Sequence, residues 1–288
     1  MKKLVKFNET PIEPYKINGK TIYVKREDLC ADYPMPPLSK MRGVFEHLKT
    51  KKGLLGCIDT RVSKSGQGIA AICKELGLFC NYYFPQCKDE DILKEKEHIK
   101  IAKELGANIF PMKASRLSIV FSRSKRHVES NGGKMLPVGL PFYETVLETA
   151  KIIKETDINY LNGTIVLATG TGTILSGIVS GLMLKNIEPK KIVGISAGMS
   201  IKKQKKMVIT QTNRIINSER NDLMDKLQSR EKILRIVELY HSHRSYYEHS
   251  PVKMPFPFHN VYEGKALEWL ENNIQNLEEP ILFWNIGS

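Results

Sequence analysis

Short apolar runs alternate with amphipathic stretches along most of the chain. The apolar runs predict strands at residues 21–25, 54–58, 79–84, 107–110, 136–138, 164–168, 191–195 and 280–285. The amphipathic stretches predict helices at 41–49, 68–76, 91–105, 174–183 and 267–274. Strands separated by helices are typical of parallel βαβ units. The sequence therefore predicts an α/β fold whose sheets are covered by helices.

Residues 199–257 interrupt this alternation. The segment is basic and predicted to be helical with few strands, until Pro251, Pro255 and Pro257 impose an extended course. No apolar run approaches the roughly 20 residues that span a bilayer. Near the N-terminus, Asn8, Glu9, Pro11 and Glu13 take the place of the apolar region of a signal peptide. We therefore expect a cytoplasmic protein.

The composition is that of an ordinary folded protein, with one exception. Of 288 residues, 41% are hydrophobic and 26% are charged. The cysteines are odd in number, lie in the N-terminal third and show no CxxC spacing, so we expect neither a disulfide framework nor a metal site; they are Cys30, Cys57, Cys73, Cys80 and Cys87. The exception is the formal charge of +13.

The positive charge has two interpretations. It forms a surface that attracts nucleic acid, or it is spread over solvated helix faces. Local clusters occur at Arg123, Lys125, Arg126 and His127 and at Lys202, Lys203, Lys205 and Lys206. Neither cluster is interleaved with aromatic residues as a single-strand binding groove would be. Charge alone thus favours solvated faces and leaves contact with nucleic acid open.

A glycine-rich turn joins the predicted strand 164–168 to the predicted helix 174–183. Its sequence is Thr169-Gly170-Thr171-Gly172-Thr173, which lacks both the GK[ST] ending of a nucleotide P-loop and the full GxGxxG spacing of a dinucleotide site. Backbone N–H groups at such a turn point toward a phosphate. A single phosphate, as on a cofactor, fits better than a triphosphate. The alternative is a turn that glycine permits for packing reasons.

Two further positions are candidates for chemistry. Lys40 follows Pro34, Pro36 and Pro37 at a junction between a loop and a helix. Burial there would lower the pKa of its amine and favour a Schiff base, although a solvated lysine is the alternative. Glu263 lies where the last predicted helix opens, and an acid at that position also simply stabilises a helix N-terminus.

These landmarks occur in the order found in one family. The chain resembles the tryptophan synthase β-like group (fold type II) of pyridoxal-phosphate enzymes, and most of all the 1-aminocyclopropane-1-carboxylate deaminase and D-cysteine desulfhydrase family. The resemblance spans most of residues 10–288 and is weakest over 199–257. The matching segments are 10–14 (TPIEP), 23–28 (YVKRED), Lys40 with Met41-Arg42, Ser63, 170–173 and 261–266.

The resemblance implies a role for each matching position. Lys40 would hold the cofactor, pyridoxal 5'-phosphate, as a Schiff base. Ser63 would lie at the substrate carboxylate and the reacting carbon, and Tyr262 near the substrate. Glu263 would keep the pyridine nitrogen protonated, which strengthens the electron sink. The phosphate would lie on Gly170, Thr171, Gly172 and Thr173.

The chain also departs from the family pattern. The family's Gly-Gly-Asn before the lysine is here 37–39 (PLS), and its His-Thr-Gly-Gly at the last strand is here 285–288 (NIGS). The asparagine that follows the family serine is here Lys64, which lies in the cofactor region and competes with Lys40 for the Schiff base. Tyr246 or Tyr247 would replace a second active-site tyrosine of the family.

From these features we expect two domains, a small one at 49–143 and a large one made of 1–48 and 144–288, with the cofactor between them. The expected function is a lyase or deaminase that acts on a free small amino acid through a carbanion. The alternative is a tailoring enzyme acting on an amino-acid-modified nucleobase in DNA, as in phage DNA hypermodification; the net charge and the altered segments favour it. A cofactor binder without activity is disfavoured because Lys40, Ser63 and Glu263 are all present. We expect a homodimer without membrane contact.

Overall fold

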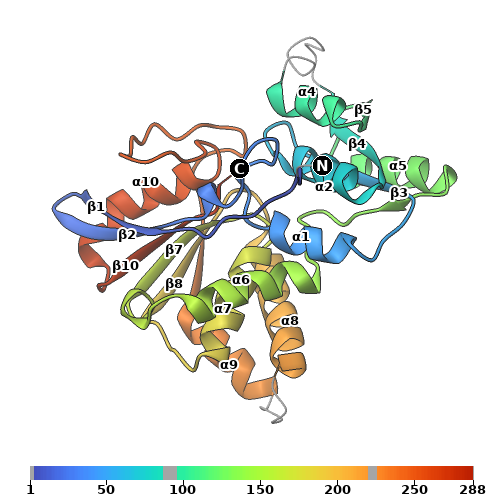
Figure 1. Cartoon of the computed structure of the whole chain (residues 1–288). Coiled ribbons are helices and arrows are strands. Elements are labelled where there is room, and N and C mark those ends of the chain that lie inside the picture. The colour runs from blue at the N-terminus through green and yellow to red at the C-terminus, as the bar shows by residue number, and fades with distance from the viewer. Residues whose placement is uncertain (1–2, 87–95, 220–225, 288) are drawn as a thin grey trace.

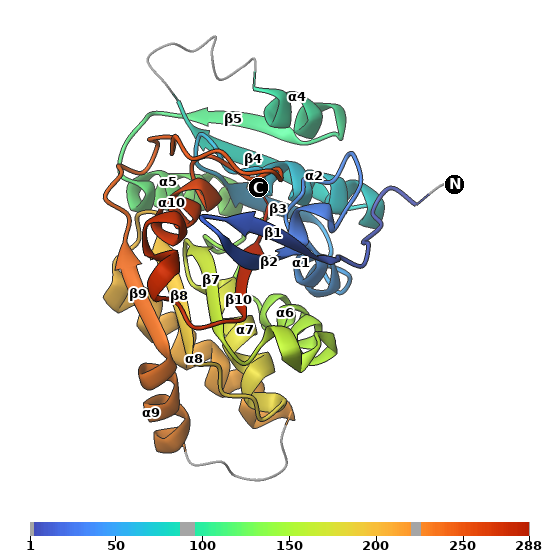
Figure 2. The ribbon, with the colours of Figure 1, turned by 90° about the vertical axis from the view of Figure 1, so that its left-hand side faces the viewer.

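The computed structural model describes residues 3–86, 96–219 and 226–287. Within them the chain forms two sheets with helices between the strands. The larger sheet has the strand order β1-β2-β10-β7-β8-β9, and the smaller has the order β5-β4-β3-β6. In Figure 2 the smaller sheet lies above the larger one. The strand pairs are parallel except for β1 with β2, in agreement with the predicted α/β class.

The larger sheet combines the two ends of the chain. Its strands are β1 (Ile12–Ile17), β2 (Lys20–Arg26), β7 (Thr164–Thr169), β8 (Lys191–Ser196), β9 (Val237–His241) and β10 (Ile281–Asn285). Every residue of β7 is buried, because helices cover both faces of the sheet. On one face α10 (Glu263–Asn273) contacts β7 and β8. On the other lie α6 (Tyr143–Glu155), α7 (Thr173–Leu184) and α8 (Ile201–Glu219) (Figure 1).

Helix α7 lies unusually close to α6. A Cβ atom on Gly177 would come within 2.3 Å of the Thr149 side chain, and one on Gly181 within 2.5 Å of Ile153. Only glycine allows this approach, so Gly177 and Gly181 determine how closely α7 packs against α6. That packing also sets where the N-terminus of α7 points.

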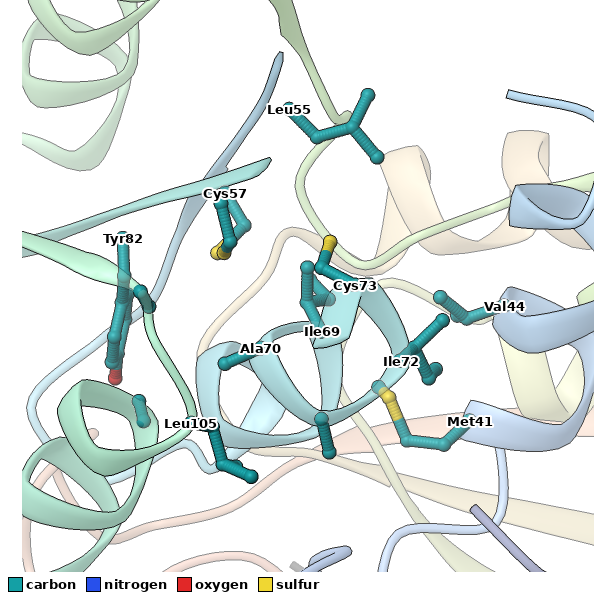
Figure 3. Close-up of a cluster of buried hydrophobic side chains, with 14 of the residues drawn as sticks. Met41, Val44, Leu55, Cys57, Ile69, Ala70, Ile72, Cys73, Tyr82 and Leu105 are labelled. Atoms are coloured by element: carbon teal, nitrogen blue, oxygen red, sulfur yellow. The ribbon is translucent and has the colours of Figure 1, made fainter. Parts of the chain in front are cut away.

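The smaller sheet comprises β3 (Leu54–Ile58), β4 (Phe79–Pro85), β5 (Asn108–Met112) and β6 (Lys134–Met135). Its helices are α2 (Ser65–Leu76), α4 (Glu97–Glu104) and α5 (Leu117–Ser130). Helix α1 (Met41–Leu48) contacts both α2 and α6. Figure 3 shows the core that results, with Met41 and Val44 of α1 beside Ile72 of α2. The described cysteines Cys30, Cys57, Cys73 and Cys80 are buried and free.

Several predicted elements differ from the structure. The strand predicted at 136–138 is wrong, because β6 occupies residues 134–135 and the chain after it turns toward a cavity. In the predicted helix 91–105, residues 91–95 lie outside the described residues and α4 begins at Glu97. Strands β1 and β9 were not predicted; β9 follows α9 (Lys226–Ile236) inside the segment 199–257. Short 3-10 turns occupy Glu27–Leu29, Ile158–Tyr160 and Ile274–Asn276.

The strands of the smaller sheet all lie within residues 49–143, and those of the larger sheet lie outside that range. The division into two domains with those boundaries remains a prediction. Among the described helices, none has the length and apolar character required to cross a membrane.

Candidate active site

A cavity of about 640 Å³ opens where the parallel strands of both sheets end. Residues one or two positions after the ends of β3, β6, β7 and β8 line it; they include Asp59, Leu136, Gly170 and Gly198. Ligands in α/β proteins bind at this edge, because loops there replace backbone pairing and helix N-termini point toward it. A smaller cavity of about 110 Å³ adjoins it. The two share the lining residues Lys40, Ser63, Gly139, Gly170 and Thr171.

Lys40 lines both cavities from the N-cap position of α1. Arg42 fixes this end of the helix through a 2.5 Å ion pair with Glu27, whose side chain is fully buried. Arg42 also donates to the Asn8 carbonyl at 2.9 Å, so two contacts hold this side chain. Close packing also contributes, since a Cβ on Gly43 would lie 2.2 Å from the Thr145 backbone. Burial lowers the pKa of the Lys40 amine, while Asp59 and Glu263 oppose that change.

The C-terminal segment holds the loop before Lys40. Gly287 has a φ of +74°, and a Cβ there would lie 1.9 Å from the Pro37 carbonyl oxygen. The Ser39 N–H donates to the Ile286 carbonyl at 3.4 Å. From the other side, the Gln67 side chain donates to the Pro34 carbonyl at 2.8 Å. The altered loop at 37–39 and the altered C-terminus therefore contact each other.

The glycine-rich turn lies against the smaller cavity. Gly172 adopts a φ of +92° and is the N-cap of α7, without a side chain that caps the helix. The first N–H groups of a helix lack intrahelical partners, so this terminus can bind an anion. A Cβ on Gly170 would meet nothing within 4 Å, so Gly170 faces open space. The hydroxyls of Thr171 and Thr173 lie 2.9 Å apart, and Thr173 also donates to the Gly139 carbonyl.

Glu263 lies at the opposite wall of the smaller cavity, at the first residue of α10. It is 1% exposed, and its Oε2 atom has no hydrogen-bond partner among the described residues. An unsatisfied buried acceptor costs about 1–3 kcal/mol or more when charged. Burial raises the pKa of this carboxyl to about 7, and the nearby charge of Asp28 adds to the rise. The arrangement favours a ligand that donates a hydrogen bond to this oxygen.

Tyr262 belongs to a hydroxyl cluster between the sheets. Its hydroxyl lies 2.8 Å from that of Tyr246 and 3.3 Å from the Thr60 hydroxyl. Of the two candidates for a second tyrosine, Tyr246 is thus the one that contacts Tyr262. Burial raises the pKa of Tyr262 well above its usual value, so the phenol stays protonated.

Ser63 and Lys64 are neighbours with different surroundings. The Ser63 hydroxyl lies 3.1 Å from that of Ser65 in the first turn of α2, and Ser63 lines both cavities. Lys64 is the N-cap residue of α2 and lines neither cavity. Burial lowers the pKa of its amine, while Glu97 and Glu263 oppose the change.

Asp59 is a site residue that the sequence analysis missed. It is 5% exposed and its Oδ2 accepts bonds from the Gly66 N–H at 2.5 Å and from the Tyr82 hydroxyl at 3.3 Å. Burial raises its pKa to about 6, although Ser63 and Lys40 pull it down. Its position directly after the strand 54–58, at the edge where ligands bind, was the available signal.

Comparison with known proteins identifies the family. No family model matches the sequence. Over 295 residues, however, the chain is 30% identical to the glycyl-dTMP PLP-dependent decarboxylase of Pseudomonas phage M6, with 97% of this chain and 99% of that protein covered. The chain belongs to this family of pyridoxal-phosphate-dependent enzymes.

Solved structures confirm the fold type II architecture of this pyridoxal-phosphate enzyme. An ACC deaminase homologue gives a TM-score of 0.75 at 19% identity, over 97% of this chain and 89% of that one. A hydrogen sulfide-producing enzyme from Fusobacterium nucleatum gives 0.62 at 16% identity, over 98% and 96%. A fungal L-serine ammonia-lyase from Rhizomucor miehei gives 0.63 at 14% identity, over 99% and 95%. The predicted fold and cofactor are confirmed.

The residues around the smaller cavity fit pyridoxal phosphate. The unsatisfied Oε2 of Glu263 matches a protonated ring nitrogen, and the open space at Gly170 beside the uncapped α7 matches a phosphate. Lys40 lies on the wall shared by the two cavities, whereas Lys64 lies outside both. This geometry favours Lys40 over Lys64 for the Schiff base, an assignment that remains a prediction.

Proposed function

We propose that this enzyme removes the carboxylate from an amino acid that is attached to a thymine nucleotide in DNA. The observation that carries the proposal is the 30% identity, over 97% of the chain, to a decarboxylase named for glycyl-dTMP. The cavity supports it: about 640 Å³ lies within the range of sites for drug-sized ligands, roughly 300–1,000 Å³, and is generous for a small amino acid. The basic charge of +13 agrees with a polyanionic substrate.

The reaction divides between the cofactor and the chain. When bound, pyridoxal phosphate would supply the electron sink for the electron pair left on Cα when the bond to the carboxylate breaks and CO2 leaves. Glu263 would hold the proton on the ring nitrogen, and the N-terminus of α7 would hold the phosphate. Ser63, at the N-terminus of α2, would orient the carboxylate. The carbon that loses CO2 gains one proton, which we assign to the Lys40 Nζ, because Lys40 lines both cavities and its burial lowers the pKa of the amine, which makes the proton easier to transfer.

Asp59 would support that proton transfer. Its carboxyl, with a pKa near 6, interacts with the Lys40 amine and is itself held by the Gly66 N–H. It would hold the ammonium in place whenever Lys40 is protonated. Tyr262 and Tyr246 would close the site beside the reacting carbon, since their linked hydroxyls line the space between the sheets.

The test uses the purified holoenzyme and a thymine nucleotide that carries glycine labelled at its carboxyl carbon, placed in an oligonucleotide. We expect release of labelled CO2, and an oligonucleotide whose mass has decreased by the mass of CO2. D-cysteine and 1-aminocyclopropane-1-carboxylate are assayed in parallel, since a lyase or deaminase of free amino acids is the rival function. Robust turnover of either amino acid, with no labelled CO2 from the oligonucleotide, would overturn the proposal.

A further inference from the structure

The larger cavity extends beyond the residues expected to hold the cofactor, and its outer lining has a distinct chemistry. Arg61 contributes from the loop after β3, Tyr246 and Tyr247 from the segment after β9, and Lys203 from the first turn of α8. None of these lines the smaller cavity. The outer part is therefore built from the loop 59–64 of one sheet and the segment 199–257 associated with the other.

The outer lining carries excess positive charge. The charged lining residues are Lys40, Asp59, Arg61 and Lys203, and the first two interact with each other. Arg61 has a buried Nε atom without a hydrogen-bond partner among the described residues. Neither Arg61 nor Lys203 has an ion pair within the described part of the chain. An occupant with negative charge would satisfy both.

The outer lining also offers an aromatic surface. The Arg61 guanidinium lies 5.5 Å from the centre of the Tyr247 ring, and Tyr247 is 43% exposed. Tyr246 meets Tyr247 edge to face at 4.9 Å, and is itself fixed by its bond to Tyr262 and by packing against Gly198. Tyr246 thus supports a second ring that remains accessible. Flat bases stack on such rings and on guanidinium planes.

We propose that Tyr247, with Arg61 packed against its ring, forms a base clamp, by which we mean one accessible stacking surface that holds the base of one nucleotide taken out of the DNA helix. The inference rests on the proposed function, because it specifies how that substrate is bound. A base inside a duplex cannot reach Lys40 at the bottom of a cavity, so enzymes that modify bases in DNA extrude the target nucleotide. The clamp would hold the extruded base while its amino acid reaches Lys40.

The test measures binding of a single-stranded oligonucleotide of unmodified bases, with one 2-aminopurine, to the holoenzyme. Stacking contributes about 1–3 kcal/mol per base, so Tyr247→Leu should weaken binding by about 5- to 150-fold, and Tyr247→Phe should retain it. Arg61→Lys keeps the positive charge but removes the planar guanidinium. We therefore expect this variant to reduce the quenching of 2-aminopurine fluorescence on binding more than it reduces the affinity for the oligonucleotide. The cofactor absorbance should stay unchanged in all of these variants.

Tyr240→Leu is the matched control. Tyr240 is 41% exposed and stacks on Trp269, yet it does not line the cavity. Equal losses for Tyr240→Leu and Tyr247→Leu, or wild-type binding by Tyr247→Leu, would overturn the clamp.

Failure of the clamp is distinguishable from failure of the proposed function. If Tyr247→Leu decarboxylates the labelled oligonucleotide with an unchanged KM, the clamp is refuted and the function stands. If the wild type neither binds the oligonucleotide nor releases labelled CO2 from it, both are refuted. A raised KM with an unchanged kcat, seen for Tyr247→Leu but not Tyr240→Leu, supports the clamp.

Discussion

At the inner end of the cavity, Lys40, the 170–173 loop and Glu263 keep the residue types expected of a pyridoxal-phosphate enzyme, and helix termini and buried packing fix each of them. At the outer end, Tyr247 and Lys203 come from residues 199–257, where the resemblance to the family is weakest, and Arg61 comes from the loop after β3. In the proposed function the inner end binds the cofactor and the outer end binds the substrate. The comparison then teaches that the chemistry and the choice of substrate depend on different parts of this chain.

The largest expected effect concerns the inner end. Lys40→Ala should abolish the yellow colour of the purified protein and the cofactor trapped by borohydride at that peptide, because no other amine among the described residues lines both cavities. Lys64→Ala is the matched control and should retain both signals. Trapping on the peptide that contains Lys64 would show that the assignment of the Schiff base is wrong.

The next effect concerns the phosphate loop. Gly170→Val would place a side chain in open space without backbone strain, whereas Gly172→Val would force a φ of +92° on a β-branched residue. If the loop binds phosphate, both should weaken cofactor affinity: Gly170→Val because its side chain would occupy the space of the phosphate, and Gly172→Val by about 10-fold for a strain of 1–2 kcal/mol. Cofactor titration and thermal unfolding of the apoprotein give the measurement. A loop that only packs would leave Gly170→Val with wild-type affinity.

A several-fold effect is expected at Glu263. Glu263→Gln should retain the cofactor but slow CO2 release, because the ring nitrogen loses its anionic partner. The pH dependence gives a second measurement. With a pKa raised from 4.5 to about 7, the folded apoprotein binds the proton more tightly than the unfolded chain, so stability falls as pH rises through that window, by about 3 kcal/mol.

Apo Glu263→Gln should lack this contribution to the pH dependence. Unfolding in urea at pH 5 and pH 8 measures the difference between variant and wild type. Parallel pH profiles would place the Glu263 carboxyl in contact with water rather than in a closed site.

The residues of the inner site were predicted from the family resemblance, and the structure brings Lys40, Ser63, Glu263 and the 170–173 loop together around the smaller cavity. The strands before the inner loops were predictable from local pattern, because 54–58 and 164–168 are each strongly apolar. The outer site was not predictable, because Arg61 meets Tyr247 only through tertiary contact between loops that are 186 positions apart in sequence. Asp59 was missed for a related reason: its partners Lys40 and Tyr82 lie on other elements.

The short and irregular elements also could not be predicted from the local pattern of apolar and polar residues. The strand predicted at 136–138 is apolar, but those residues line the cavity rather than a sheet. Strand β9 lies in a basic segment whose pattern is helical, and it becomes a strand by pairing with β8 at the edge of the larger sheet. Tertiary context decided both cases.

The smallest expected effect separates the two basic clusters and tests the outer end. Lys203 lines the cavity, and its neighbour Lys202 is exposed on the same helix turn. In α5, by contrast, Lys125 forms an ion pair with Glu129, and the His127 ring bonds to the Tyr83 hydroxyl.

If DNA enters by the outer end, Lys202→Ala with Lys203→Ala should reduce the slope of log affinity against log salt by about 0.7 per lost phosphate contact. Replacement of Arg123 and Lys125 by alanine is the matched control, and should leave the slope nearly unchanged because those residues do not line the cavity. Equal slopes in the two double variants would mean that DNA is attracted by net charge alone, without a defined path to Lys40.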